Sequence, residues 1–180
     1  TTFDAPSASA ALDDGAADVE REDDAQLQFV AVGAYQFVQA QRAAARLRER
    51  GWRVRTTSII EPGRLRAARD EFEARVTLSD ERLQALFPAG VPRVLVSHTR
   101  PEIMTGVMRR IDEGPTKLRA HGYLSRGGTL DAMGMLFANR CTWAHLVVSA
   151  ASLIGVPASD FLTSAEEAAA LGRGAPLALW

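Results

Sequence analysis

From residue 27 onward, short apolar runs alternate with longer segments in which apolar residues recur every three or four positions. The short runs are typical of buried strands, and the longer segments are typical of amphipathic helices that cover a sheet. Strands are predicted at residues 27–34, 52–60, 93–98 and 117–123. Strands separated by helices favour right-handed crossovers, which join parallel strands. The pattern therefore predicts an α/β fold with three layers, α/β/α, around a mostly parallel sheet of about five strands.

The helices between these strands are predicted from the same periodicity. Residues 35–51 form a helix that a terminal glycine closes. Residues 64–76 place Leu65 and Phe72 on one helical face. After the last strand, apolar residues recur at helical spacing over residues 130–154, which predicts one long helix.

The segment ahead of the first strand has a different composition. Residues 1–26 are rich in Ala, Ser, Asp and Glu, and their eight acids and one arginine give a net charge of −7. The remainder of the chain carries +6, toward a total of −1. The segment has few large apolar side chains, and burying them cannot offset the conformational entropy that the chain loses when it becomes ordered. We expect an acidic linker, disordered or extended, ahead of one domain over residues 27–180; an acidic tail that binds a basic partner is the alternative.

The bulk composition narrows the class of protein. With 47% apolar and 24% charged residues, the chain has no overall attraction to nucleic acid or to anionic membranes. Its single cysteine, Cys141, rules out an internal disulfide and a cysteine-cluster metal site. No apolar run approaches the roughly 18 residues of a membrane span, so a cytoplasmic location is expected. The first residue is not Met, which suggests a fragment of a longer protein.

In a parallel α/β sheet, ligands bind at the carboxyl ends of the strands. Residues 33–35, 98–101 and 121–129 follow three of the predicted strands and contain polar or glycine residues. Two histidines, His98 and His121, lie at these ends, where an imidazole could serve as a general acid or base. The three segments are therefore the first candidates for a functional site.

The remaining polar candidates favour structural roles. No metal-ligand spacing links the three histidines, so no metal site is expected. Asn139 and His145 are six positions apart on a predicted helix and point in different directions, so packing or interface roles are favoured for both. Ser97 and His98 are adjacent strand residues on opposite faces and do not form a nucleophile and base pair.

A glycine turn lies directly before the last predicted helix. The backbone of Gly127 and Gly128, with Thr129 and Arg126, could bind a phosphate at a helix N-terminus. The alternative is a tight turn in which Thr129 caps its own helix, and the absence of a complete phosphate-binding motif favours it. The residues alone thus define an α/β domain without a self-sufficient catalytic constellation.

Residues 79–101, SDERLQALFPAGVPRVLVSHTRP, resemble the C-terminal domain of phosphoketolases. The shared features are a Leu-Ser-Asp start, a Leu-Phe pair eight residues on, a buried strand and then His-x-x-Pro. The resemblance covers about residues 27–148. Further residues that fall on matching positions of that family are Gly122, Tyr123, Gly127, Thr129, Met135, Asn139, His145 and Leu146.

The resemblance implies a domain of a thiamine-diphosphate enzyme related to transketolases. In these enzymes the first and second α/β domains hold thiamine diphosphate and its Mg across a dimer interface, and the third domain packs against them. Phosphoketolases cleave xylulose 5-phosphate or fructose 6-phosphate with inorganic phosphate to give acetyl phosphate and a shortened aldose phosphate. By this resemblance the chain has a transketolase C-terminal-like fold, binds no cofactor itself and contributes no catalytic residue.

The resemblance also implies partners and a candidate site. The partners are thiamine-diphosphate-binding domains or subunits of the same enzyme, in a parent that is a homodimer, with neither nucleic acid nor membrane. Asn139 and His145 are expected to be structural or interface residues. The candidates for a substrate site or phosphate loop are His98, His121, Tyr123, Arg126, Gly127 and Thr129.

Several positions depart from the family pattern. The His-Gly pair of the family is Val76-Thr77 here, and Thr99 replaces a glycine after the strand. Ser125-Arg126 replaces an acidic pair. These changes lie in predicted loops, where specificity resides, so we expect a diverged member that transfers a two-carbon unit to another acceptor. The alternative is a free-standing, noncatalytic α/β subunit that docks on separate cofactor-binding subunits or binds a small anion.

Overall fold

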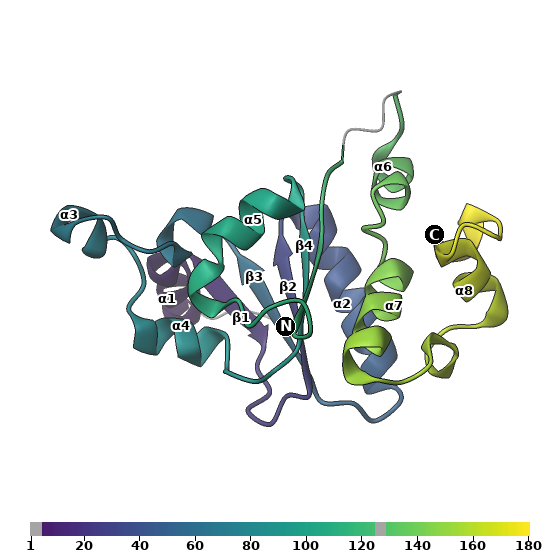
Figure 1. Ribbon diagram of the computed structural model, residues 1–180, viewed down its shortest axis with the longest axis horizontal. Helices are drawn as coiled ribbons and strands as arrows, with labels where there is room; N and C mark the ends of the chain where they lie inside the picture. Colours follow the sequence, from purple (N-terminus) through teal and green to yellow (C-terminus); the bar gives the residue numbers. More distant parts are fainter. Residues whose placement is uncertain (1–4, 125–128) are drawn as a thin grey trace.

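The computed structural model describes residues 5–124 and 129–180, and a five-stranded sheet lies at its centre (Figure 1). Four strands are parallel, and only β1 runs antiparallel, paired with β3. The predicted mostly parallel sheet is therefore confirmed. In spatial order the strands are β1 (Ala16–Glu20), β3 (Val54–Ile59), β2 (Leu27–Val32), β4 (Arg93–Ser97) and β5 (Leu118–His121).

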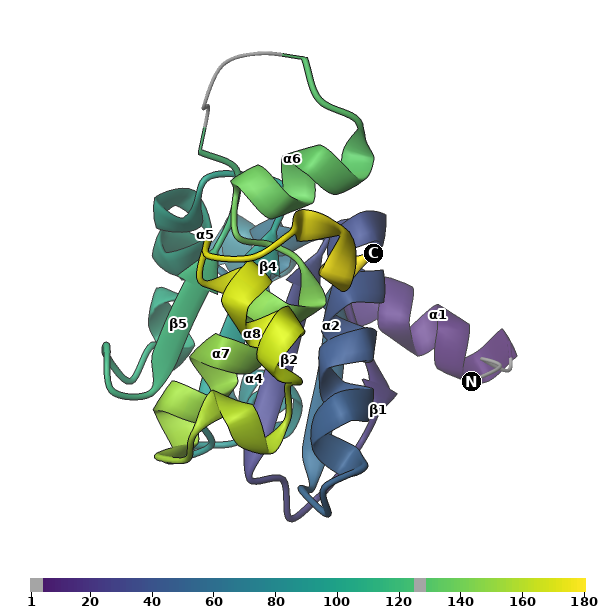
Figure 2. The same cartoon turned by 90° about the vertical axis from the view of Figure 1, so that its right-hand side faces the viewer.

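Helices cover both faces of the sheet (Figures 1 and 2). Helices α2 (Ala34–Arg48) and α7 (Trp143–Ile154) pack on one face, and α8 (Ser164–Ala170) packs on α7. Helices α4 (Asp80–Leu86) and α5 (Pro101–Val107) contact the other face. This arrangement confirms the predicted α/β/α layers.

The alternation of β2 explains why its sequence is apolar throughout. All six residues of the strand are buried. Phe29 and Ala31 point into the core beneath α2 and α7, whereas Val30 and Val32 point into the core beneath α4 and α5. A strand covered on both faces has no solvent-exposed positions, so its hydrophobic pattern is continuous.

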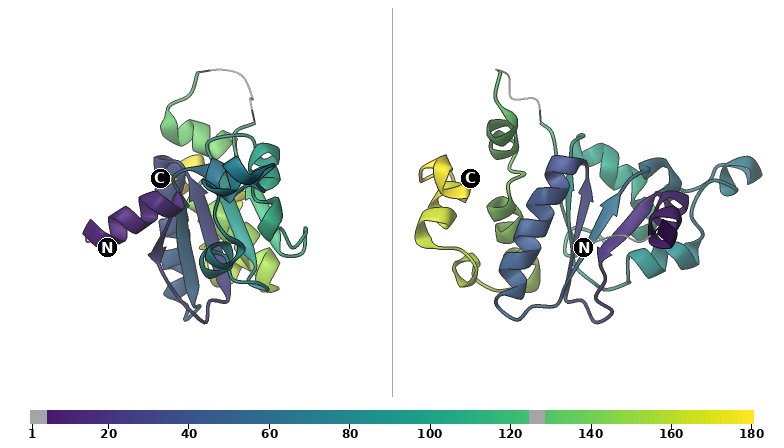
Figure 3. Two further views of the ribbon diagram at one scale, coloured as in Figure 1. Left: turned by 90° about the vertical axis from the view of Figure 1, so that its left-hand side faces the viewer. Right: turned by 180° about the vertical axis from the view of Figure 1, so that it is seen from behind.

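The acidic N-terminal segment contradicts the expectation of an unpacked linker. Residues of this segment form helix α1 (Ala5–Asp14) and strand β1, which pairs with β3 at the sheet edge (Figure 3). Ala16 is buried, and the carboxylate of Asp18 pairs with Arg55 of β3. From composition alone such acids are interpreted as solvated charges, because composition does not reveal ion-pair partners that are distant in the sequence.

The helix predicted over residues 64–76 is wrong. The chain there forms a 3-10 turn (Pro62–Leu65) and one short helix, α3 (Glu71–Ala74), with non-helical backbone between them. Phe72, expected on the same face as buried Leu65, is 76% exposed. Further 3-10 turns are at Arg109–Ile111, Ala158–Asp160 and Pro176–Leu179.

The long helix predicted over residues 130–154 is interrupted. It consists of α6 (Ala132–Ala138) and α7, separated by Arg140, whose backbone is left-handed (φ 56°). A left-handed residue cannot continue an α-helix, so the chain changes direction there. Among the described residues, no helix is long and apolar enough to span a membrane.

Candidate functional site

The sheet order defines where a ligand would bind. Strand β2 is followed in sequence by β3 on one side, and β4 lies on its other side. Loops that leave β2 and β4 therefore diverge, which opens a crevice at the carboxyl ends of these strands. A pocket of about 180 Å³ lies there, and a second hollow of about 470 Å³ adjoins it. His98 borders both.

Close packing of Gly33 against His98 shapes the crevice. Gly33 ends β2 with a φ of 109°, a conformation that side chains disfavour. A Cβ at this position would lie 2.6 Å from the side-chain oxygen of Gln36 and 3.0 Å from Nδ1 of His98. Only glycine therefore allows the imidazole to lie against the end of β2.

The position of His98 also determines its neutral tautomer. Its Nδ1 lies 3.0 Å from the carbonyl oxygen of Val32. Because a carbonyl can only accept a hydrogen bond, Nδ1 carries the proton in the neutral ring. The Nε2 lone pair of this exposed side chain is then available to accept a hydrogen bond from a ligand in the crevice.

Ser97 forms local hydrogen bonds. Its hydroxyl lies 2.9 Å from the hydroxyl of Thr99 and accepts the backbone N–H of Thr99, also at 2.9 Å. These bonds fix the turn after β4 and leave Ser97 unpaired with His98. The sequence argument against a nucleophile and base pair is confirmed.

Tyr123 enters the crevice because Gly122 allows two loops to touch. A Cβ on Gly122 would lie 2.2 Å from the carbonyl oxygen of Thr99, and that same oxygen accepts the backbone N–H of Tyr123 at 2.9 Å. The phenol of Tyr123 then lines the pocket together with His98. The Gly-Tyr pair thus joins the β5 exit to the β4 exit.

Asn139 holds the helix that covers the pocket. At the end of α6, its side-chain oxygen accepts the N–H of Leu124 at 2.6 Å, and its amide nitrogen donates to the carbonyl of Met135 at 2.8 Å. Both Asn139 and Met135 line the pocket, as does Cys141. Burial raises the pKa of Cys141 to about 12, so it remains a thiol at neutral pH.

His121 and His145 do not join His98. The Nε2 of His121 hydrogen-bonds the hydroxyl of Ser149 at 2.8 Å, and Nδ1 of His145 hydrogen-bonds the hydroxyl of Thr142 at 2.7 Å. Burial lowers the pKa of each histidine to about 4, against a smaller opposing effect of backbone hydrogen bonds. Both rings are neutral at pH 7. His121 connects β5 to α7, and His145 bonds the N-cap residue of its own helix.

The predicted phosphate loop is only partly described. Arg126 and Gly127 lie outside the described residues. Thr129 is exposed and does not cap the following helix, because Asp131 is the N-cap and accepts the backbone N–H of Gly134 at 2.7 Å. The alternative in which Thr129 caps its own helix is therefore wrong.

Two crevice residues were not named individually as site candidates, although residue 35 lies in the first candidate segment, residues 33–35. Tyr35 and Gln36 begin α2 and line the pocket opposite Tyr123 and Asn139. The signal was present, because a glycine that ends a buried strand placed this turn at the ligand edge of the sheet. Over residues 5–124 and 129–180, no group of three His, Cys, Asp or Glu side chains is arranged to hold a metal ion.

The fold and the crevice together define an α/β domain with a ligand-type cleft at its topological switch point. No protein-family model matches the sequence, and no curated protein matches it. Among solved structures, transketolase from Leishmania mexicana has a similar fold, with a TM-score of 0.57 and 24% identity, over 86% of this chain and 19% of that one.

Transketolases from other organisms also have a fold similar to that of this chain. Transketolase from Pichia stipitis, solved in complex with sedoheptulose 7-phosphate, has a TM-score of 0.56 and 19% identity, over 79% of this chain and 18% of that one. Transketolase from Campylobacter jejuni has a TM-score of 0.56 and 13% identity, over 78% of this chain and 19% of that one. These identities establish the fold alone, and the chain spans about a fifth of the length of these transketolases.

Proposed function

We propose that this chain is the C-terminal domain of a phosphoketolase-like, thiamine-diphosphate-dependent enzyme. The parent would cleave a carbon–carbon bond of a ketose phosphate and transfer the two-carbon unit. The observation that carries the proposal is the transketolase fold over 86% of the chain. The resemblance of residues 79–101 to phosphoketolases supports the more specific assignment.

The proposed role of the domain is to pack against the other domains and to support a dimer. Exposed apolar side chains around the crevice support this role. Tyr35, Ile60, Tyr123 and Leu124 are between 37% and 64% exposed, and the first three of them line the two hollows. Clustered apolar side chains of this kind are typical of surfaces that contact another protein unit.

The proposal assigns thiamine diphosphate and its Mg to other domains of the parent. A Mg that holds a diphosphate needs clustered oxygen ligands, and the described residues provide no cluster of three acids. In this proposal the chain contributes no residue to the reacting centre. The loop that begins at Tyr123 and contains Arg126, Gly127 and Thr129 is proposed to lie near the substrate phosphate.

An activity assay tests the proposal directly. The chain alone, supplied with thiamine diphosphate, Mg, inorganic phosphate and xylulose 5-phosphate or fructose 6-phosphate, should consume no ketose phosphate and form no acetyl phosphate. The same chain within its parent, or mixed with the cofactor-binding subunits, should restore the reaction. Turnover by the isolated chain would contradict the proposal. Calorimetric binding of phosphate to a chain that associates with no cofactor-binding partner would favour the noncatalytic, anion-binding alternative.

The phosphate-loop assignment has its own test. In the assembled enzyme, Arg126→Ala should raise the KM for phosphate with little change in kcat, because a binding contact outside the reacting atoms is lost. Arg50→Ala removes an exposed arginine just beyond the other end of α2 and is the matched control. An unchanged KM for phosphate in Arg126→Ala would exclude this arginine from the substrate site.

A further inference from the structure

Strand β1 is held to the sheet mainly by polar contacts. Its buried apolar side chains are two alanines, Ala16 and Ala17, which remove little apolar surface from water. The backbone ladder to β3 and two hydrogen bonds to the carbonyl of Gly15, from Ile60 and Glu61 at 2.8 Å, add to this attachment. The remaining polar contacts are ion pairs and side-chain hydrogen bonds of Asp18 and Glu20.

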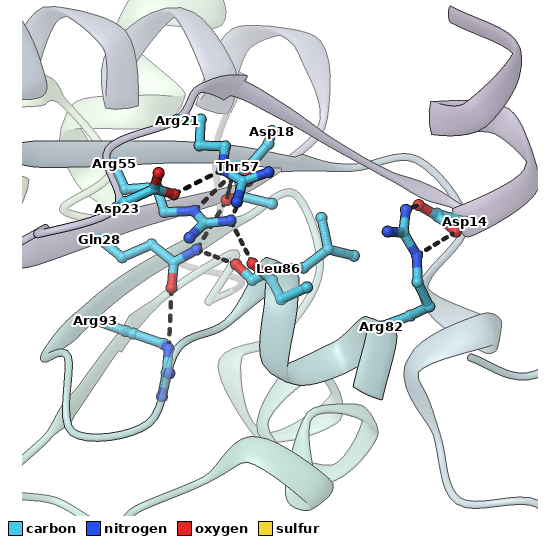
Figure 4. A network of polar contacts seen from close by, with 11 residues as sticks. Asp14, Asp18, Arg21, Asp23, Gln28, Arg55, Thr57, Arg82, Leu86 and Arg93 are labelled. Atoms are coloured by element: carbon cyan, nitrogen blue, oxygen red, sulfur yellow. Dashed lines mark hydrogen bonds and ion pairs between the residues drawn. The ribbon is translucent and has the colours of Figure 1, made fainter. Parts of the chain in front are cut away.

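The side chain of Asp18 binds polar groups on one face of the sheet (Figure 4). Its carboxylate accepts hydrogen bonds from Nε of Arg55 and from the hydroxyl of Thr57, both at 2.9 Å. The Arg55 side chain is only 3% exposed and also donates to the carbonyl of Ala85 at the end of α4. A buried guanidinium requires such a carboxylate, because an unpaired buried charge is costly.

The side chain of Glu20 binds polar groups on the opposite face. A β-bulge lies between the two acids, since Asp18 pairs with Thr57 whereas Glu20 pairs with Thr56. Residues two apart in a regular strand share a face, and the bulge reverses this relation. The carboxylate of Glu20 therefore meets the hydroxyl of Thr56 at 3.0 Å and Nη1 of Arg48, from α2, at 2.5 Å.

The edge of β3 thus has an arginine on each face and a ladder of backbone groups between them. We propose that this edge is a docking surface for an extended Asp-Val-Glu strand, which residues 16–20 occupy reversibly and which the same strand of a second copy of the chain can occupy. Exchange between copies would reproduce every contact and change only the connection at residues 21–26. Within that connection Asp23 pairs with Arg21 at 2.8 Å. Glu22 and Asp24 leave it with a net negative charge, which favours an extended form. The proposal is independent of the proposed function.

Hydrogen exchange on the full chain tests whether the strand opens separately. Raising the salt concentration from about 0.1 M to about 1 M screens partly exposed ion pairs such as Glu20 with Arg48. The amides of residues 16–20 should then exchange about tenfold faster, while those of β2 keep their protection. Equal exchange of both strands under all conditions would mean that β1 opens only with the whole domain, and would overturn the proposal.

Substitutions separate the specific ion pair from general charge. Glu20→Gln should raise the exchange of residues 16–20 at low salt and weaken its salt dependence. Asp13→Asn removes one negative charge from an exposed residue of the acidic segment that lies outside the connection at residues 21–26, and should behave like the wild type. The protection of β2 reports that each variant remains folded. Identical behaviour of the two variants would overturn the role of Glu20.

Binding in trans tests the docking surface itself. A labelled peptide of residues 13–24 should bind the full-length Glu20→Gln chain, whose own strand is weakened. The same peptide with Asp18→Asn and Glu20→Gln should bind at least about tenfold more weakly, because it loses both charged contacts. Fluorescence anisotropy measures both affinities. Equal binding of the two peptides, or binding of neither, would overturn the proposal.

Discussion

Acidification should destabilise this domain through two buried histidines. His121 connects β5 to α7, and His145 lies in the core beside Phe137, with ring centroids 5.5 Å apart. The His121 ring is hydrogen-bonded to the hydroxyl of Ser149, and the His145 ring is hydrogen-bonded to the hydroxyl of Thr142. Burial lowers the pKa of each to about 4, so protonation places two charges in the interior.

The size of the effect follows from the difference between the folded and unfolded states. The pKa of each histidine is about 4 in the folded chain and about 6.5 in the unfolded chain. Because the unfolded state binds more protons, the stabilisation is complete above the unfolded pKa and is lost as the pH falls below it. When the pH falls from 7 to 5, protonation of each histidine in the unfolded state should lower the free energy of unfolding by about 2 kcal/mol. The two histidines together should lower it by about 4 kcal/mol. That is a large part of the stability of a typical domain.

Urea unfolding, followed by tryptophan fluorescence, measures this loss. His121→Gln and His145→Gln should each lower stability at pH 7 and reduce the difference between pH 7 and pH 5 by about 2 kcal/mol, because one titrating group is removed. His98→Gln replaces an exposed ring and is the matched control. If all four proteins lose the same free energy between pH 7 and pH 5, then buried neutral histidines do not govern the acid stability.

Two further substitutions test the packing. Gly122→Ala should destabilise the fold by more than about 2 kcal/mol in thermal unfolding, because its Cβ would lie 2.2 Å from the carbonyl oxygen of Thr99. Gly106→Ala is the control, because a Cβ there would have no atom within 4 Å, and it should be neutral or stabilising in the same assay. Trp143→Phe should cost about 1 to 3 kcal/mol in urea unfolding, since the indole N–H donates to the carbonyl of Leu179 at 2.9 Å in the core. Wild-type stability of either destabilised variant would contradict these contacts.

The parallel part of the sheet was predictable because its signals are local. Strands β2, β3 and β4 are short apolar or β-branched runs, and Gly33 marks the end of the first. Strand β5, with the sequence Leu-Arg-Ala-His, is less apolar and is followed directly by Gly122. The candidate ends of strands followed directly from this reading. The order of the strands did not follow, because it depends on which strand pairs with which. The 180 Å³ pocket between the ends of β2 and β4 was therefore visible only in the structure.

The fifth strand escaped prediction because its stabilising partners are distant in sequence. The acids of residues 13–24 look like a solvated tail when they are counted alone. Asp18 meets Arg55 across 37 residues, and Asp14 meets Arg82 across 68. Arginines of the basic remainder thus neutralise the acids of the edge strand, and the opposite charges of the two regions, −7 and +6, were the available signal.

The break between α6 and α7 shows why periodicity misplaced one site residue. Apolar spacing continues through Phe137 and Cys141, so a continuous helix was the simplest interpretation. A continuous helix would use the backbone of Asn139 and Arg140 for internal hydrogen bonds. In the structure, the left-handed Arg140 ends α6 at Asn139, and the Asn139 side chain accepts the N–H of Leu124. That contact holds the exit of β5, with Tyr123, beside the crevice. The side chain of Asn139 therefore joins the end of α6 to the loop after β5 at the ligand edge, and the sequence pattern did not show this because it placed Asn139 in the middle of one long helix.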